Sequence, residues 1–266
     1  MEEESESSCF YLFIFRFELF MKVEINQLAK QYDNKTVLNI EHLDIEKPGI
    51  VGLVGNNGAG KTTLFMLMLD LLRATSGTIN YHIDEQLTYS STENDKWKPF
   101  IGAFVDNSFL IDFLTADEYL RFIAQLSNIS NEQLENHLTF FSRFIGADIL
   151  GTNMLIRNLS AGNKQKVGIV AAFLLHPSLV LLDEPFNFLD PSSQNVLKHL
   201  LQVYSEEYQS IVIISSHNIQ HTIDISQRIL LLEKGKIIKD LDNTNKVAEA
   251  ELQTYFESQE FQFLTG

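Results

Sequence analysis

The chain has 266 residues, a formal net charge of −15 and a hydrophobic fraction of 45%. Such a chain can bury a full core, which excludes an intrinsically disordered protein, and its acidic surface would repel backbone phosphates, which argues against a nucleic-acid partner. Cys9 is the only cysteine, so neither an internal disulfide nor a cysteine-based zinc site can form, as expected in a reducing cytosol.

Residues 1–20 differ in character from the rest of the chain. An acidic start precedes an aromatic run at 10–20, which two charges interrupt. The run is shorter than the roughly 20 apolar residues of a membrane-spanning helix, and it lacks the basic start and small-residue cleavage site of a signal peptide. We expect an extension outside the fold, with membrane-surface contact as the alternative, and a fold that begins at Met21.

The next segments read as strands. Alternating apolar and polar residues predict two half-buried strands joined by a polar turn at 32–35, and we expect a small antiparallel sheet that ends at Pro48-Gly49. These strands and the later strand-like segments lie at 22–25, 37–45, 79–81 and 100–105.

An apolar strand at 50–54 leads into a glycine-rich loop and then a helix, with the spacing GxxxxGK[ST]. The loop and the start of the helix comprise Gly55, Asn56, Asn57, Gly58, Ala59, Gly60, Lys61, Thr62 and Thr63. Glycines let the backbone N–H groups turn inward, and the helix adds its positive N-terminal end, as a phosphate cradle requires. We predict that Lys61 reaches the β- and γ-phosphates of a nucleotide and that Thr62 ligates Mg²⁺. A merely structural turn is the alternative, and the four fixed positions in this context argue against it.

Between residues 115 and 158 the apolar residues recur at the spacing of an α-helix. Capping boxes at Thr115 and Ser130 each open an apolar pattern. The second pattern places on one helical face Leu134, Leu138, Phe141 and Ile145. We predict a helical lobe inserted in an α/β chain, with its phenylalanines in the core.

Two continuous apolar runs, at 179–182 and 211–214, predict parallel strands buried on both faces. Two further strands, 229–232 and 236–238, flank Lys234-Gly235 as a hairpin.

The first of these apolar runs ends in Asp183 and Glu184, at the edge of a parallel sheet where ligands bind. Asp183 can hold Mg²⁺ there, and Glu184 can orient or deprotonate the water that attacks a γ-phosphate. A solvated acidic pair is the alternative, which the phosphate loop disfavours.

The stretch Leu159-Ser160-Ala161-Gly162-Asn163 resembles the LSGGQ signature of the ATP-binding cassette (ABC) ATPases, and it precedes the acidic pair as that family requires. The resemblance covers residues 21–240. It implies an α/β fold: a P-loop NTPase core with a mixed or parallel sheet, an N-terminal antiparallel β subdomain and an inserted α-helical subdomain at about 107–164. A C-terminal tail would follow at 241–266.

The resemblance also implies roles for single residues. Tyr32 matches the aromatic residue that stacks on adenine, Asp190 the aspartate of the loop after the acidic pair, and His217 the switch histidine at the γ-phosphate. Ser160 and Gly162 would face the γ-phosphate of ATP bound to a second subunit.

The chain departs from the family pattern at four positions, Ala161, Asn163, Asp106 and Phe188. Asp106 stands where the family usually has a glutamine that senses Mg²⁺ and the transmembrane partner. Its carboxylate can still ligate Mg²⁺, but it adds negative charge beside the phosphates. Phe188 replaces the usual glycine before Leu189-Asp190, in a loop that contacts the second subunit in the family.

The resemblance implies ATP hydrolysis, with Mg²⁺, by a transporter subunit that powers a transmembrane permease. The permease would be a separate chain, because no segment of this sequence is long and apolar enough to span a membrane. The family forms a head-to-tail homodimer or pseudo-dimer around ATP. We therefore expect a cytoplasmic protein, peripheral on the inner face of the membrane. The acidic residue at 106 resembles bacitracin- and lantibiotic-type exporters, which favours export.

The alternative function is an ABC ATPase without a transport role, regulatory or ribosome-associated. A ribosome-associated member would normally carry two phosphate loops, and this chain has one. A chromosome-organising member would carry a long coiled coil, for which the roughly 60 residues between Asp106 and the signature leave no room. A solitary regulatory ATPase stays open.

Overall fold

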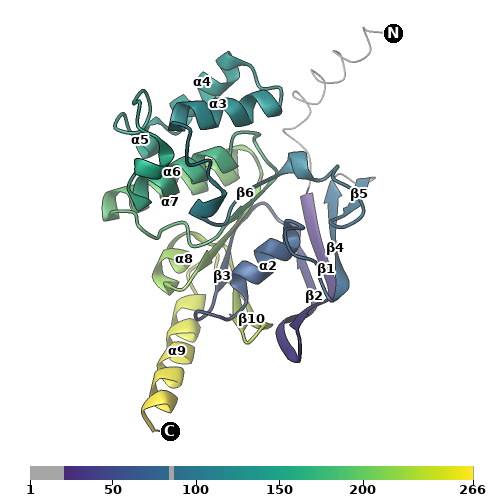
Figure 1. Ribbon diagram of the computed structural model, residues 1–266. Coiled ribbons are helices and arrows are strands. Elements are labelled where there is room, and N and C mark those ends of the chain that lie inside the picture. The colour runs from purple at the N-terminus through teal and green to yellow at the C-terminus, as the bar shows by residue number, and fades with distance from the viewer. Residues whose placement is uncertain (1–20, 84–86, 266) are drawn as a thin grey trace.

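The computed structural model describes residues 21–83 and 87–265, so the predicted extension at 1–20 lies outside it. The described chain forms two β-sheets with one helix between them, and a helical lobe lies at one end of the larger sheet (Figure 1).

The smaller sheet has the strand order β2-β1-β4-β5, with antiparallel neighbours throughout. Alternation explains it: Val23 and Ile25 are fully buried, whereas Lys22 and Glu24 between them are partly exposed. The predicted antiparallel sheet is confirmed, and β5 is a strand that the sequence analysis did not predict. The strands are β1 (Met21–Tyr32), β2 (Lys35–Ile45), β4 (Ser76–Ile83) and β5 (Leu87–Ser90).

The larger sheet has the order β10-β9-β3-β8-β7-β6, in which every pair is parallel except the β9–β10 hairpin. Both predicted buried strands and the predicted hairpin are confirmed. The strands are β3 (Gly49–Val54), β6 (Ile101–Phe104), β7 (Leu179–Leu182), β8 (Ile211–Ser216), β9 (Arg228–Glu233) and β10 (Lys236–Asp242).

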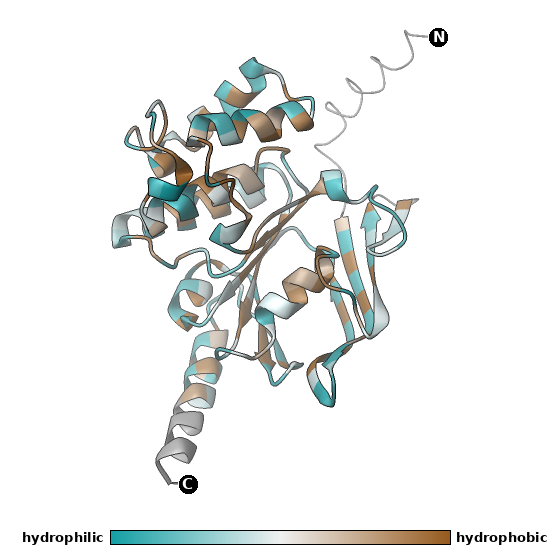
Figure 2. Cartoon of the chain, viewed as in Figure 1, coloured by the Kyte–Doolittle hydropathy of each residue, from teal (hydrophilic) through white to brown (hydrophobic). Residues whose placement is uncertain are grey.

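Strand β7 shows how this sheet is covered on both faces. Leu179 and Leu181 pack in the cluster that contains α2 (Lys61–Met68), while Val180 and Leu182 pack in the cluster that contains the helical lobe. All four are fully buried, and each contributes roughly 1.5–3 kcal/mol of apolar burial. Figure 2 shows these central strands as an almost uninterrupted apolar band.

The helical lobe consists of α3 (Ala116–Leu126), α4 (Asn131–Phe140) and α5 (Ser142–Ile145), and it packs on α6 (Ala161–Ala172). Both predicted capping boxes form, at Thr115 and Ser130. The four residues predicted on one face, from Leu134 to Ile145, do pack in or against one core cluster, but one continuous helix through Ile145 is wrong, because α4 ends at Phe140. The Ser142 hydroxyl donates to the Thr139 carbonyl at 2.7 Å, in competition with continued helix.

The remaining helices cover the larger sheet. Helix α7 (Pro191–Glu207) shares the lobe's cluster, and α8 (Ile219–Ile225) packs with α9 (Ala248–Thr265) against β9. The segment expected as a C-terminal tail thus contains α9, whose Leu252 is fully buried. In residues 21–83 and 87–265 no helix is both long and apolar enough to cross a membrane. Short 3-10 helices lie at η2 (Lys98–Phe100), η3 (Asn107–Phe109) and η4 (Ile156–Asn158).

Candidate functional site

The phosphate loop leaves the carboxyl end of β3, a central strand of the larger sheet, and enters α2, in the predicted order. Glycine is required twice: Gly60 has a φ of +113°, and a Cβ on Gly55 would lie 2.3 Å from the carbonyl oxygen of Leu232. Lys61, the first residue of α2, is only 6% exposed, and its Nζ donates to the Gly55 carbonyl at 2.6 Å. The loop therefore keeps a buried cation against its own backbone.

Asp183 follows β7 directly and contacts the phosphate-loop helix. The Thr62 hydroxyl donates to Asp183 Oδ2 at 2.5 Å, and the Ser215 hydroxyl donates to Asp183 Oδ1. Burial raises the pKa of Asp183, and these two hydrogen bonds oppose the shift. The predicted pair Thr62 and Asp183 is thus in contact.

Glu184 has a φ of +47°, a left-handed conformation that costs a non-glycine residue about 1–3 kcal/mol. Its Oε1 lies 3.4 Å from Lys61 Nζ, and its Oε2 lies 2.8 Å from His217 Nδ1. The backbone N–H of His217 donates to the same Oε2 at 3.3 Å. Three of the predicted residues, from three separate segments of the chain, therefore converge on one point.

Ser215 is a contact residue that the sequence analysis missed. It is fully buried, and its hydroxyl oxygen accepts the backbone N–H of Glu184 at 2.8 Å. A serine within an apolar, fully buried strand needs hydrogen-bond partners, and that was the available signal.

Tyr32 and Asp106 lie at the ends of strands β1 and β6. Tyr32 is 49% exposed, with Lys30 Nζ 4.6 Å from its ring centroid. Asp106 accepts the backbone N–H of Ser108 at 2.7 Å and caps η3. Because Phe104 pairs with Leu182 in parallel strands, Asp106 and Asp183 leave the sheet at the same edge. Their roles toward adenine and Mg²⁺ stay predictions.

The signature residues lie at the start of α6. Ser160 is its N-cap and accepts the Asn163 N–H at 3.1 Å. A Cβ on Gly162 would lie 2.6 Å from the carbonyl oxygen of Phe188, so this loop touches the loop after the acidic pair. Phe188 is 68% exposed and left-handed, with a φ of +62°. The role of the signature toward a second subunit stays a prediction.

Asp190, two residues after Phe188, is the N-cap of α7. It accepts both the hydroxyl, at 2.6 Å, and the backbone N–H of Ser193, at 3.0 Å. The hydroxyl bond is the main reason why the pKa of Asp190 is lowered. This carboxylate therefore anchors the loop to its own helix.

These groups form a chemically coherent set. A buried ammonium at a helix N-terminus suits a phosphate chain, and a carboxylate beside an imidazole can accept a proton. Thr62 and Asp183 offer adjacent oxygen ligands of the kind that Mg²⁺ prefers, and one protein carboxylate suffices where phosphates supply the rest. The residues present therefore fit a magnesium nucleotide.

Comparison with known proteins points to one family. Residues 38–187 match the ABC transporter family. The bacitracin transport ATP-binding protein BcrA of Enterococcus faecalis is 31% identical, over 83% of this chain and 69% of its own length. The methionine import ATP-binding protein MetN 2 of Bacillus cereus is 28% identical, over 82% of this chain. This chain spans only 65% of the length of that protein.

Solved structures share the fold. A bacterial ABC transporter cassette in dimeric form matches 83% of this chain and 98% of its own, with a TM-score of 0.72 and 22% identity. An ATP-binding subunit of an ABC transporter matches 92% of this chain and 99% of its own, with a TM-score of 0.74 and 24% identity. The expected architecture, with its two sheets and inserted helical lobe, is confirmed.

Proposed function

This chain belongs to the ABC transporter family of ATPases, and from this premise we propose that it binds and hydrolyses ATP as the ATP-binding subunit of a transporter. The observation that supports the proposal most is that the Glu184 carboxylate, at a phosphate loop, lies 3.4 Å from Lys61 Nζ and 2.8 Å from His217 Nδ1. A phosphate-binding site alone would not need the carboxylate and the imidazole there.

In the proposed reaction, the loop N–H groups and Lys61 bind the β- and γ-phosphates. A water oxygen bonds to the γ-phosphorus while the bond to the bridging β–γ oxygen breaks, and Glu184 accepts the proton that the water loses. The products are ADP and inorganic phosphate, and His217 holds the Glu184 carboxylate toward the phosphates. Mg²⁺ held by Thr62 and Asp183 would neutralise phosphate charge.

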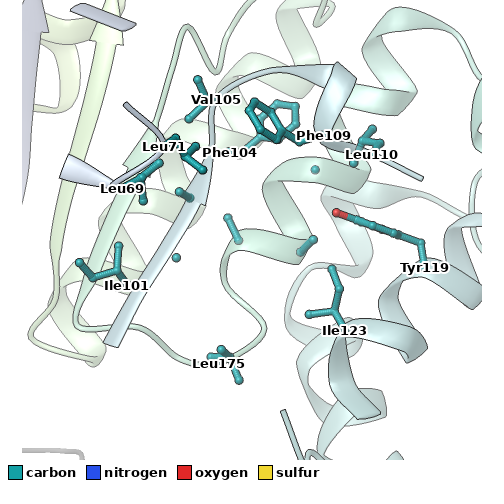
Figure 3. A pocket seen from close by; sticks show the side chains of 15 residues that line it. Leu69, Leu71, Ile101, Phe104, Val105, Phe109, Leu110, Tyr119, Ile123 and Leu175 are labelled. Atoms are coloured by element: carbon teal, nitrogen blue, oxygen red, sulfur yellow. The ribbon is translucent and has the colours of Figure 1, made fainter. Parts of the chain in front are cut away.

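We place the transmembrane partner, on a separate chain, at an apolar cavity of about 250 Å³ between the larger sheet and the helical lobe (Figure 3). Its wall includes Val105, which precedes Asp106, and the exposed Phe109 and Leu71. Tyr119 and Ile123 of α3 close the other side. Exposed aromatic and aliphatic side chains around a hollow suit a protein partner. We also propose that the chain is peripheral, on the inner face of the membrane.

We further propose that two copies, or this chain and a similar one, assemble head to tail, with Ser160 and Gly162 completing the ATP site of the partner. The solved cassette with the same fold is dimeric. Export is the proposed direction, because at Asp106 this chain resembles bacitracin- and lantibiotic-type exporters; the bacitracin relative is a transport protein, and the methionine relative is an import protein. Inverted membrane vesicles containing the complete complex would decide it by the side on which substrate accumulates.

The test is co-purification and turnover. The full chain, tagged in its own cells, should carry with it a chain that has several membrane-spanning helices, identified by mass spectrometry, and the complex should hydrolyse ATP. An active complex without such a chain would overturn the transport role, and the absence of hydrolysis would overturn the enzymatic one.

Two variants on α3 test the proposed docking position of the membrane subunit. Ile123→Glu places a charge in the apolar cavity, whereas Gln125→Glu adds the same charge at an exposed position of the same helix. Ile123→Glu should release the membrane subunit and leave ATP binding intact, and Gln125→Glu should release nothing. Equal retention by both variants would move the partner elsewhere.

A further inference from the structure

Glu184 is held at its backbone as well as at its carboxylate. Its φ of +47° is a conformation that a glutamate rarely adopts, so surrounding contacts have to maintain it. Both polar groups beside its Cα are engaged: the N–H donates to Ser215 Oγ at 2.8 Å, and the carbonyl accepts Gln165 Nε2 at 3.1 Å. These two side-chain partners come from different elements, β8 and α6, and the carbonyl also accepts the backbone N–H of Asn187 at 3.1 Å.

Neither Ser215 nor Gln165 can exchange its bond to Glu184 for a hydrogen bond to water. Ser215 is fully buried and Gln165 is 4% exposed. A serine hydroxyl has one proton, and Ser215 gives it to Asp183 Oδ1, which as a carboxylate oxygen can only accept. The lone pairs of Ser215 are then left for the Glu184 N–H, so the direction of both hydrogen bonds is determined.

The result is one continuous chain of hydrogen bonds. Thr62 donates to one oxygen of Asp183, Ser215 donates to the other, and the Glu184 N–H donates to Ser215. His217, the residue that follows β8, contacts the Glu184 carboxylate. The Ser215 hydroxyl therefore links the two residues of the acidic pair, in addition to the direct contacts of the Glu184 carboxylate with Lys61 and His217.

We infer that Ser215 and Gln165 are positioning residues for ATP hydrolysis, which set the direction of the Glu184 carboxylate by clamping its peptide from both sides. The inference rests on the proposed ATPase function. It adds two residues that act through Glu184 and touch no substrate. Without the clamp, Glu184 relaxes toward a common backbone conformation and its carboxylate leaves Lys61 and His217.

The test compares Ser215→Ala, which removes the bonds to the Glu184 N–H and to Asp183, and Gln165→Met, which removes the bond to the Glu184 carbonyl alone, with Ser210→Ala. Ser210 is 1% exposed, precedes β8 at its other end and donates to the Pro177 carbonyl, so its loss is a matched control for a missing buried hydroxyl. Both clamp variants should lower kcat about 10- to 100-fold, as expected for lost positioning. Affinity for ATP in EDTA should change less than about threefold, because no phosphate contact is lost. Ser210→Ala should keep kcat, and Ser215→Thr should recover part of it.

A double-mutant cycle separates positioning from a general structural effect. If Ser215 acts through Glu184, adding Ser215→Ala to Glu184→Gln should cost less than about threefold in single-turnover hydrolysis, far less than in wild type. Thermal unfolding of every variant checks that the protein is folded, and Gln165→Met decides the matter if Ser215→Ala does not fold.

Unchanged kcat in both clamp variants, or an equal loss in the Glu184→Gln background, would overturn the inference while wild-type hydrolysis stands. Wild-type hydrolysis that equals that of Lys61→Ala would overturn the proposed function itself. The two failures are thus distinguishable.

Discussion

At the scale of single residues, Lys61 is a cation with little access to water. A buried ammonium costs several kcal/mol unless it is paired, and here the Gly55 carbonyl and the Glu184 carboxylate compensate it. Both partners can give way to phosphate oxygens, which accept the same charged hydrogen bonds. The site is therefore built around a cation whose present partners a nucleotide can replace.

Lys61→Ala should lower affinity for ATP about 100-fold or more, because two charge-assisted bonds to phosphate, each worth about 1.5–3 kcal/mol, are lost. Equilibrium titration with a fluorescent ATP analogue measures this. Lys96→Ala, at an exposed lysine, is the control and should bind like wild type. Unchanged affinity in Lys61→Ala would refute the loop assignment.

Glu184→Gln should retain ATP binding and lose about 10²- to 10⁴-fold in kcat, because a neutral amide cannot accept the proton of the attacking water. Size-exclusion chromatography with Mg-ATP should show a trapped dimer, whereas wild type returns to monomer as ATP is consumed. Asp106 is a second carboxylate at the same sheet edge, so Asp106→Asn is added in a double variant. Turnover within a few-fold of wild type in that double variant would remove Glu184 from the catalytic role.

At the scale of elements, His137 of α4 lies where the helical lobe packs on α6. It is 4% exposed, and its Nε2 lies 3.3 Å from the Val170 carbonyl oxygen. Its ring also contacts Phe141 and His176, with centroids 4.9 and 5.4 Å away. Burial, and then the charge of His176, lower the pKa of His137 to about 4. The lobe is therefore docked through a neutral histidine.

Acid should weaken this docking. The folded pKa lies below the ordinary value of 6.5, so the unfolded chain takes up the proton first, and stability present above about pH 6.5 is lost as the pH falls toward 4. Between pH 7 and pH 5 the loss from His137 is roughly 2 kcal/mol. Urea unfolding at both pH values, compared with His137→Gln, isolates this loss from that of the other groups. An equal pH dependence in both proteins would contradict it.

At the scale of the whole molecule, the arrangement keeps the signature and the phosphate loop on different elements. Gly162 touches the loop that carries Phe188, and the contacts described for Ser160 lie within its own helix start. The proposed site, completed by a second subunit, would account for the exposure of Ser160 at the start of α6.

Ser160→Arg should leave ATP binding by the isolated subunit largely intact and abolish cooperative hydrolysis, because the bulky cation blocks the second subunit's nucleotide. Turnover measured against protein concentration tests this. The lost N-cap itself costs about 1 kcal/mol, so Ser130→Arg, which removes an equivalent cap from α4, is the matched control. Hydrolysis like that of wild type at every concentration would exclude the composite site.

The sequence by itself determined what depends on neighbouring residues. Loop spacing predicted the phosphate loop, apolar runs predicted the strands buried on both faces, and the caps at Thr115 and Ser130 predicted where two helices begin. These features follow from local backbone chemistry and from hydrophobic period, which a linear pattern carries. The order of the acidic pair after its strand likewise placed it at the correct edge of the sheet.

Only the tertiary structure decided which side chains meet. Lys61 and Glu184 come from different strand ends, as do Glu184 and Ser215, and the clamp on Glu184 needs α6 as well. The sequence pattern also did not predict the end of α4 at Phe140 or the strand β5. The Ser142 hydroxyl bonds to the Thr139 carbonyl just beyond that helix end, and β5 forms by pairing with β4. Such contacts depend on how separate elements pack, and the left-handed backbone of Glu184 exists only because that packing holds it.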